Sequence, residues 1–416
     1  MKIYLEVYGC TANKSDASLV KGLLKEESHE IVEKIDDSDV IVLLTCTVIG
    51  TTEQRMLSRL REFKKTGKKI IVTGCMASAQ PDLVKSIVPN AQLLSPQYVY
   101  NILGLLDDKK VFFKMRNKTL LPKYYANIAA PISIAEGCMF SCSYCITSIA
   151  RGKLKSYPID EVVQDVCSAL RQGCKEIQLT AQDTGSYGLD SDHNLGELLT
   201  SVCKVKGDYR IRVGMANPYT ILENLDSTIQ AFNNTKIYKF LHIPVQSGDD
   251  GILKKMNRKY TVDDFLEIIK KFREKYVDST ISTDIIVGFP TETDEQFQHT
   301  IDLLKIVKPD ITNVTRYSSR PHTKAKVMKG RVRTDVAKER SRILTKLCME
   351  LSKENNRRHV RRKYTVLITE KGKNNTVIGR TENYKPVVIR EKAEMGKITP
   401  VIITDAASTY LFGRLI

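Results

Sequence analysis

The stretch "EGCMFSCSYCITSIARG", residues 136–152, places three cysteines within eight positions. Cys138, Cys142 and Cys145 follow the spacing C-x3-C-x2-C, and we call them the loop trio. Zinc sites and iron–sulfur clusters usually take four protein ligands, so three thiolates in one loop leave one ligand position open. What occupies that position decides the chemistry of the chain.

Zinc and an iron–sulfur cluster compete for the loop trio. A closed zinc site needs a fourth Cys or His nearby, and the next cysteines, Cys167 and Cys174, belong to the following helical segment. Three thiolates suit a 4Fe–4S cluster in which one iron lacks a protein ligand. A small molecule can then chelate that iron and receive an electron from the cluster.

The sequence around the loop trio alternates strand and helix patterns. Six candidate strands are present: "PISIA", "EIQLT", "YRIRVG", "KFLHIPV", "STDIIVGF" and "ITNVTR". Helical patterns lie between them, for example over residues 159–172, 221–232, 262–276 and 295–307. Six such units predict a partial (β/α)6 barrel over residues 124–353, with its site in the loops that follow the strands.

The first part of the chain predicts a separate parallel α/β domain over residues 1–110. The strands "KIYLEVYGC", "DVIVLLTC" and "KKIIVTGC" are separated by helical patterns over residues 16–27 and 52–65. Each strand ends on a cysteine, and we call Cys10, Cys46 and Cys75 the strand trio. Because the carboxyl ends of parallel strands share one edge, the strand trio should converge there. Ordinary buried cysteines are the alternative.

The last part, residues 357–416, loses helical periodicity. "YTVLITEKG", "NTVIGRTENYKPVVIR" and "KITPVIITDAASTYLFGRLI" read as short strands broken by Gly, Asn and Pro. They predict a small all-β, OB-like barrel, which either binds RNA or acts as a structural cap.

Charge and composition favour a polyanionic partner. The net charge is +17, and residues 316–363 carry 17 Lys and Arg against four Asp and Glu. Contact with a phosphate backbone is the favoured interpretation, and a solvated helix face is the alternative. Neither a signal-peptide pattern nor a long apolar run is present, so we expect a cytoplasmic protein without a membrane partner, whose cysteines are not paired in disulfides.

The spacing of the loop trio resembles that of radical SAM enzymes. The order of the three predicted domains, which covers essentially the whole chain, resembles the methylthiotransferase family. The motifs that carry this resemblance are "YGCTANKSD", "LTCTV", "VTGC", "GCMFSCSYCITSIARGKLKSYPIDEV", "LTAQDTGSYG", "HIPVQSGDDGILKKMNRKYT", "TDIIVGFPTETDEQF" and "SRPHTKAKVM".

The resemblance implies two 4Fe–4S clusters and S-adenosylmethionine as cofactors. The loop trio would hold the cluster that cleaves S-adenosylmethionine, and the strand trio would hold an auxiliary cluster that carries the sulfur. The C-terminal segment resembles the TRAM domain, which binds tRNA. An electron donor such as a ferredoxin or flavodoxin is implied, while the sulfur donor stays open.

Within this family the motifs "LTAQDTGSYG", "RIRVGMANP" and "ARGKLKSYPIDE" are most similar to the archaeal and eukaryotic tRNA N6-threonylcarbamoyladenosine enzymes. That branch adds a methylthio group to C2 of the modified adenosine at tRNA position 37. Methylthiolation of N6-isopentenyladenosine or of a ribosomal-protein aspartate is the alternative within the family. A non-catalytic, zinc-containing RNA-binding protein is the alternative of another class.

The N-terminal motifs depart from the family pattern at three positions. The family usually has N-x-x-D-S-E after the first cysteine; Asn13 and Asp16 match it, whereas Ala17 and Ser18 do not. Leu44 replaces the usual Asn before Thr-Cys. All six cysteines are kept, so the departures concern the surroundings of the strand trio.

The resemblance also implies contacts to S-adenosylmethionine. Tyr144 matches a position against the adenine, while Gln182 and Asp183 match a polar position near the methionine amino group. Arg212 would pair with the carboxylate. Gln246 and Ser247 would line the barrel mouth, and Gly288 would let backbone approach the adenine. Loop packing, capping, a structural ion pair and a simple turn are the respective alternatives. No catalytic group beyond the cluster ligands is predicted, and His242 is interpreted as a core residue.

Overall fold

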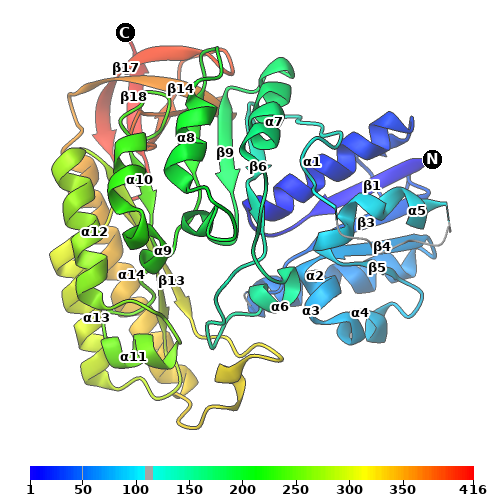
Figure 1. Ribbon diagram of the computed structural model, residues 1–416, viewed down its shortest axis with the longest axis horizontal. Helices are drawn as coiled ribbons and strands as arrows, with labels where there is room; N and C mark the ends of the chain where they lie inside the picture. Colours follow the sequence, from blue (N-terminus) through cyan, green and yellow to red (C-terminus); the bar gives the residue numbers. More distant parts are fainter. Residues whose placement is uncertain (49, 108–115) are drawn as a thin grey trace.

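The N-terminal domain is a parallel sheet covered by helices on both faces, shown in blue and cyan in Figure 1. The computed structural model describes residues 1–48, 50–107 and 116–416. The strand order is β2-β1-β3-β4-β5. The strands are β1 (Lys2–Val7), β2 (Glu30–Val32), β3 (Val40–Thr45), β4 (Lys69–Gly74) and β5 (Gln92–Leu94). The predicted α/β domain is therefore confirmed. The two short edge strands, β2 and β5, were not predicted from the sequence.

Helices of this domain form one layer on each side of the sheet. Central strand β3 is buried along its whole length, as expected for a parallel strand covered on both faces. One face packs against α1 (Thr11–Glu26), η1 (Pro96–Asn101) and α5 (Ile102–Leu106). The other packs against α2 (Gly50–Lys65), α3 (Cys75–Ala79) and α4 (Pro81–Ile87). The expected domain boundary at residue 110 lies outside the described residues.

The central barrel contains six parallel strands in two sheets of three. Their orders are β10-β9-β6 and β11-β12-β13. The strands are β6 (Ala129–Ser133), β9 (Glu176–Thr180), β10 (Arg210–Val213), β11 (Phe240–His242), β12 (Thr280–Val287) and β13 (Ile311–Arg316). A single bridge between Ile211 and Ile237 links the sheets. Since the lateral edges of β6 and β13 do not pair, the predicted partial (β/α)6 barrel is confirmed, with an open side.

The helices of the central barrel follow the predicted periodicity, with one correction. They are α7 (Ile159–Arg171), α8 (Leu195–Cys203), α9 (Pro218–Glu223), α10 (Leu225–Ala231), α11 (Asp250–Lys255), α12 (Val262–Lys275), α13 (Asp294–Val307) and α14 (Thr334–Arg357). In α12, Thr261 and Asp264 form a capping box, and the apolar side is buried. The helix expected over residues 221–232 is instead two helices, because Asn224 leaves the helical conformation between α9 and α10.

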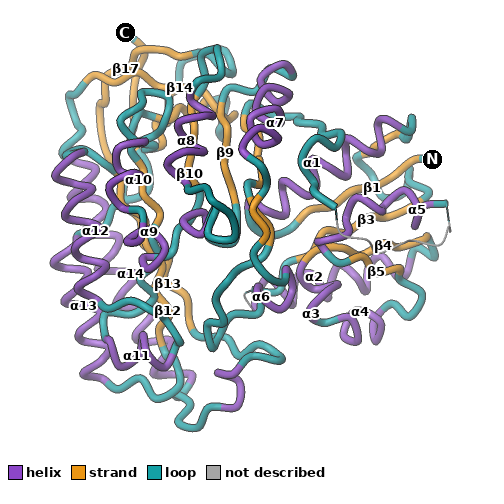
Figure 2. Tube along the Cα trace, viewed as in Figure 1, coloured by secondary structure: helices purple, strands orange, loops and turns teal. Residues whose placement is uncertain are grey.

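Five short elements interrupt the long loops of the central domain, which are teal in Figure 2. They are β7 (Ala135–Glu136), β8 (Lys155–Ser156), α6 (Thr147–Arg151), η2 (Thr184–Ser186) and η3 (Lys324–Val327). The helix α6 follows the loop trio directly and packs against α3 of the N-terminal domain.

The C-terminal barrel is closed, with the order β14-β15-β16-β18-β17. Its strands are β14 (Lys363–Lys371), β15 (Val377–Arg380), β16 (Pro386–Ile389), β17 (Ile398–Ala406) and β18 (Leu411–Leu415). This confirms the predicted small all-β barrel. It sits on the amino-terminal ends of the central strands, where Lys385 Nζ lies 2.7 Å from Asp310 Oδ1. The carboxyl ends, which carry the loop trio, therefore lie at the opposite end of the central barrel.

Within residues 1–48, 50–107 and 116–416, no helix combines the length and apolar character needed to cross a membrane.

Candidate functional site

The loop trio lies in a cavity of about 910 Å³ at the carboxyl ends of the central strands. All three cysteines line it, and so does Val48 of the N-terminal domain, two residues after Cys46. The cavity continues along the open edge strand β13 to Ser408 and Thr409 of the C-terminal barrel. Its volume lies in the range of small-molecule sites. All three domains thus contribute to one continuous cavity.

The loop that carries the trio is held in place by backbone contacts. The Ser143 amide donates to Met256 O at 2.9 Å, and the Ala325 amide donates to Ser143 O at 2.7 Å. The Phe140 amide donates to Cys138 Sγ at 3.4 Å, and Arg258 Nη1 lies 3.5 Å from Cys142 Sγ. Both sulfurs therefore have donors of the kind that stabilise a thiolate.

Burial disfavours the thiolate form of two of these cysteines by raising their pKa. It raises the pKa of Cys138 to about 12, and neighbouring Asp183, Cys145 and Cys142 add to this effect. Burial also raises the pKa of Cys142, although Arg258 opposes that rise. Such thiols ionise readily only when iron or another metal takes the place of the proton.

The strand trio meets at the carboxyl edge of the N-terminal sheet. Cys10 caps the start of α1 just after β1, Cys46 follows β3, and Cys75 follows β4, and these three strands are neighbours. Burial raises the pKa of Cys75 to about 12, and the nearby thiols of Cys10 and Cys46 contribute. At Gly74 the backbone has φ +88°, and a Cβ there would lie 2.4 Å from Thr45 O. Glycine thus permits the close approach of β3 and β4 next to Cys75.

Each trio supplies three thiols, the ligand type that iron–sulfur clusters take. Among the described residues, no three His, Cys, Asp or Glu side chains are arranged to hold one metal ion. In a 4Fe–4S cluster each thiolate binds a different iron, so the sulfurs stand further apart than around one ion. All six cysteines are free of disulfides, as the ligands of a cluster must be.

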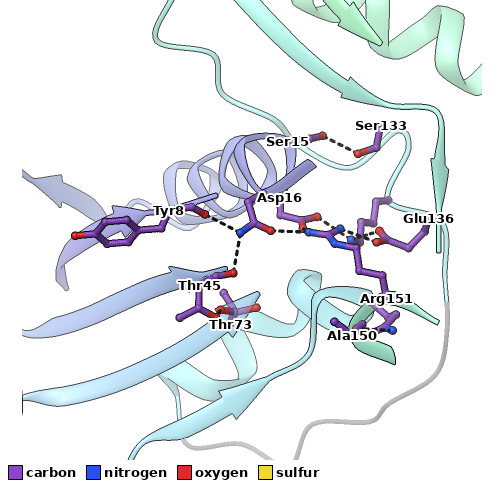
Figure 3. A network of polar contacts seen from close by, with 12 residues as sticks. Tyr8, Ser15, Asp16, Thr45, Thr73, Ser133, Glu136, Ala150 and Arg151 are labelled. Atoms are coloured by element: carbon purple, nitrogen blue, oxygen red, sulfur yellow. Dashed lines mark hydrogen bonds and ion pairs between the residues drawn. The ribbon is translucent and has the colours of Figure 1, made fainter. Parts of the chain in front are cut away.

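The strand trio does not line this cavity, but one of its members packs against the segment that follows the loop trio. Cys75 and Ala79 of α3 pack against Ile146 and Ala150, which directly follow the loop trio. Figure 3 shows the polar contacts beside this packing, where Arg151 reaches Asp16 and Glu136. On the other side of the interface, Arg320 Nη1 donates to Glu53 Oε2 at 2.7 Å and holds the loop that follows Cys46.

Four of the seven residues expected to contact S-adenosylmethionine line the cavity: Tyr144, Gln182, Asp183 and Gln246. Oε1 of Gln182 is buried without a hydrogen-bond partner among the described residues. Such an orphaned acceptor fits a ligand N–H group. The carboxylate of Asp183 is already occupied, because it accepts from the Asn217 amide at 2.9 Å and from other groups of the same loops.

The other three residues lie outside the cavity lining. The guanidinium of Arg212 stacks over Phe240 and Tyr384, 5.2 and 5.5 Å from the ring centroids, and so points toward the C-terminal barrel. Ser247 is buried and accepts from the Asp249 amide at 3.3 Å. A Cβ on Gly288 would lie 2.7 Å from Ala337 Cβ, so the lack of a side chain at Gly288 allows α14 to pack closely here. The structure does not bring these three residues to the site.

Several polar residues of the site were not predicted from the sequence. Arg258 contacts the loop trio, and Asp284 lines the cavity with His242 Nε2 3.2 Å from both of its oxygens. Asn313 Nδ2 donates to Asp284 at 2.7 Å, so the histidine belongs to a polar group at the cavity. Arg258 stands in the quoted motif "MNRKYT", which was the available signal.

Two of the three departures from the family pattern are core positions of the N-terminal domain. Leu44 is fully buried in the core beneath α1, and Ala17 belongs to the same core. Asn13 and Asp16, which match the family, are the residues that contact Arg151, at 2.7 and 2.8 Å.

Family comparisons match three segments of the chain. Residues 2–95 match "Uncharacterized protein family UPF0004", residues 132–304 match the Radical SAM superfamily, and residues 357–416 match the TRAM domain. Membership of the radical SAM superfamily implies a 4Fe–4S cluster and S-adenosylmethionine as cofactors.

A solved structure shares the fold. The radical S-adenosylmethionine methyltransferase TsrM from Kitasatospora setae, with cobalamin and a [4Fe-4S] cluster bound, has a TM-score of 0.59 at 14% identity. The match covers 78% of this chain and 77% of that chain. At this identity the likeness concerns the fold alone.

Curated relatives extend over the whole chain. The "Probable threonylcarbamoyladenosine tRNA methylthiotransferase" of Pyrococcus horikoshii is 40% identical over 100% of both chains. The "Threonylcarbamoyladenosine tRNA methylthiotransferase" of Homo sapiens is 32% identical over 99% of this chain and 74% of its own length. The chain therefore belongs to the threonylcarbamoyladenosine tRNA methylthiotransferase family of radical SAM enzymes.

Proposed function

We propose that the protein replaces the C2 hydrogen of N6-threonylcarbamoyladenosine at tRNA position 37 with a methylthio group. The observation that carries this proposal is the single cavity that contains the loop trio and extends to the C-terminal barrel, and whose lining residue Ile146 packs against Cys75 of the strand trio. One-electron chemistry, which the cofactors supply when bound, suits an aromatic C–H bond that has no acidic proton. The protein supplies binding, orientation and exclusion of water.

In this proposal the loop trio holds the cluster that binds S-adenosylmethionine. Gln182 would accept from the methionine amino group through its unpartnered Oε1, and Tyr144, which also lines the cavity, would hold the adenine. Gln246 also lines the cavity, and Arg258 donates to Cys142. Arg212, Ser247 and Gly288 support the barrel and are not assigned to the cofactor.

The strand trio holds the second 4Fe–4S cluster and receives the sulfur. Its three positions at one sheet edge and the packing of Cys75 against α6 support this assignment. Val48 of the N-terminal domain borders the cavity that holds the loop trio, so the two domains meet beside this site.

Arg316 supports a threonylcarbamoyl over an isopentenyl substrate. It ends β13 and lines the cavity, and its guanidinium has no hydrogen bond or ion pair within the described part of the chain. The other arginine of the lining, Arg258, is engaged with Cys142, Tyr260 and Pro244. The threonyl group carries a carboxylate that an available guanidinium binds well, whereas an isopentenyl group is apolar.

The tRNA lies along α14 and the C-terminal barrel in this proposal. Exposed Arg342, Lys346 and Lys353 line a groove on α14 that also reaches Ser408, which borders the cavity. Phosphate contacts of this kind make affinity fall as salt rises. We also propose that the protein works in the cytoplasm with a ferredoxin- or flavodoxin-type electron donor.

The proposal is tested in cells by deleting the gene and measuring tRNA nucleosides by mass spectrometry. We expect 2-methylthio-N6-threonylcarbamoyladenosine to disappear, N6-threonylcarbamoyladenosine to accumulate, and the wild-type gene to restore the product. An unchanged nucleoside profile contradicts the proposal. A loss confined to 2-methylthio-N6-isopentenyladenosine assigns the other tRNA substrate.

A further inference from the structure

A buried group of four charged side chains connects the N-terminal domain to the segment that carries the loop trio. Arg151 Nη1 lies 2.6 Å from Glu136 Oε1, and Nη2 lies 2.8 Å from Asp16 Oδ2. Lys118 Nζ lies 2.7 Å from Asp16 Oδ1 and 2.5 Å from Glu136 Oε2. We call Asp16, Lys118, Glu136 and Arg151 the interface quartet; Figure 3 shows its surroundings. Two cations balance two anions, so the quartet is neutral by itself.

Arg151 extends beyond the quartet to the strand trio. Ala150, its neighbour in α6, packs against Cys75. Arg151 Nη2 donates to Asn13 Oδ1 at 2.7 Å, three residues after Cys10 in the chain. Two of its nitrogens have partners in the quartet or in Asn13, whereas Nε is buried without one among the described residues.

The position of Arg151 in the chain joins both centres. It ends α6, which begins two residues after Cys145, and α6 packs on α3, which begins at Cys75. A displacement of either cysteine set would therefore move the guanidinium relative to the other. An unpaired donor buried at this point is costly unless a further acceptor is present.

We propose that Arg151 is a positioning residue for the auxiliary cluster, to whose sulfur atoms it donates a hydrogen bond across the domain interface. The inference rests on the proposed second cluster and adds a residue that holds and tunes it. Charge and hydrogen bonds to sulfur set the reduction potential of iron–sulfur clusters. A fixed cation beside the strand trio favours the more reduced, more negative state, so its removal should shift the midpoint potential to more negative values.

A purely structural role for Arg151 predicts a different pattern. The guanidinium would then only neutralise Asp16 and Glu136, and its loss would be repaired by removing one carboxylate as well. The double variant Arg151→Gln, Asp16→Asn restores that balance but not the donor at the cluster. Arg151→Lys keeps the charge and loses the planar donor set.

Arg340 provides a matched control elsewhere in the chain. Its guanidinium is also buried, lies 2.6 Å from both Glu292 and Asp294, and has an unpartnered Nε. Its partners belong to the loop after β12 and to α13, not to either trio. Arg340→Lys should therefore disturb packing to a similar extent without affecting the auxiliary cluster.

The experiment uses the full-length chain with alanine at all three loop-trio positions, so that the strand trio alone binds a cluster. After anaerobic reconstitution, iron and sulfide content, the rate of iron loss to a chelator and the midpoint potential are measured. Unfolding of the cluster-free protein is followed in parallel. We expect Arg151→Lys, which loses the planar donor set, and the double variant to lose iron faster than the parent. The double variant, which also loses the cation, should titrate at more negative potential than the parent and unfold more like the parent than Arg151→Gln does.

Two results overturn the inference, and they differ in what else they overturn. If the parent binds a cluster but the Arg151 variants match it and Arg340→Lys in potential and iron loss, Arg151 has only a structural role. If the parent itself binds no cluster, the auxiliary site of the proposed function fails together with this inference.

Discussion

Replacing Lys118 by methionine removes one of the two cations from the interface quartet. Its amine lies 2.7 Å from Asp16 and 2.5 Å from Glu136, and the side chain is only 5% exposed. The variant leaves two buried carboxylates with Arg151 alone. Removal of one partner from a buried ion pair costs about 3–5 kcal/mol of folding stability. Because Lys118 has two short contacts, we expect the free energy of unfolding to fall by about 4 kcal/mol.

The loss should depend on pH in a defined direction. Burial raises the pKa of Glu136, but Lys118 and Arg151 outweigh it and lower that pKa to about 2. Without Lys118 the folded protein binds a proton at Glu136 more easily. The destabilisation is therefore full near neutral pH and shrinks as the pH falls toward the usual carboxyl range.

Urea unfolding of the cluster-free protein at about pH 7 and about pH 5 measures both effects. Circular dichroism is the suitable signal because the chain has no tryptophan. The control is Lys308→Met, which removes an exposed ion pair with Glu354 and should cost less than about 1 kcal/mol. A loss for Lys118→Met no larger than that of the control refutes the reasoning, as does a loss that grows toward about pH 5.

Three further predictions concern the two trios, Arg316 and acid stability. Alanine at any position of the loop trio should abolish cleavage of S-adenosylmethionine, whereas alanine in the strand trio should spare cleavage and stop methylthio transfer. Chromatography of 5′-deoxyadenosine and of nucleosides measures the two activities separately. Loss of cleavage in both sets of variants contradicts separate roles. Arg316→Gln should lower kcat/KM on tRNA carrying N6-threonylcarbamoyladenosine roughly tenfold to a hundredfold, because it removes a hydrogen bond to a charged group. Arg171→Gln is an exposed control. Equal kcat/KM values for the two variants argue against carboxylate binding by Arg316. The wild-type protein should lose stability as the pH falls below the ordinary carboxyl pKa of 4.5 toward about 2, where Glu136 takes up its proton; Glu136→Gln should lack that part of the loss in acid-unfolding curves.

Much of the fold was predictable because the decisive patterns are local. Strand β3 is a continuous apolar run, and α12 buries Phe265, Ile268, Ile269 and Phe272 at helical spacing. Strands β2 and β5 escaped prediction because three residues at a sheet edge carry too little pattern. The break at Asn224 also escaped, since Leu225 continues the apolar pattern into the next helix.

Site residues were predictable where the spacing of a motif identifies them, and they were not predictable where their role depends on contacts between distant parts of the chain. The loop trio lies in one motif, and strand topology brings the strand trio to one edge. Arg151 meets Asp16 across 135 positions and Arg258 meets Cys142 across 116, so neither role is visible locally. Arg212 was predicted to bind the cofactor because its strand pattern does not show where its side chain points. In the structure its guanidinium stacks on Tyr384 of the C-terminal barrel.

Conversion of a purified substrate tests the central claim most directly. Reconstituted protein is incubated anaerobically with reductant, sulfide, S-adenosylmethionine and tRNA that carries N6-threonylcarbamoyladenosine, and the nucleosides are analysed by mass spectrometry. The account predicts 2-methylthio-N6-threonylcarbamoyladenosine with the wild-type protein and none when the strand trio is replaced by alanine. Cleavage of S-adenosylmethionine without any methylthio product from the wild-type protein, or equal product from the variant, would contradict it.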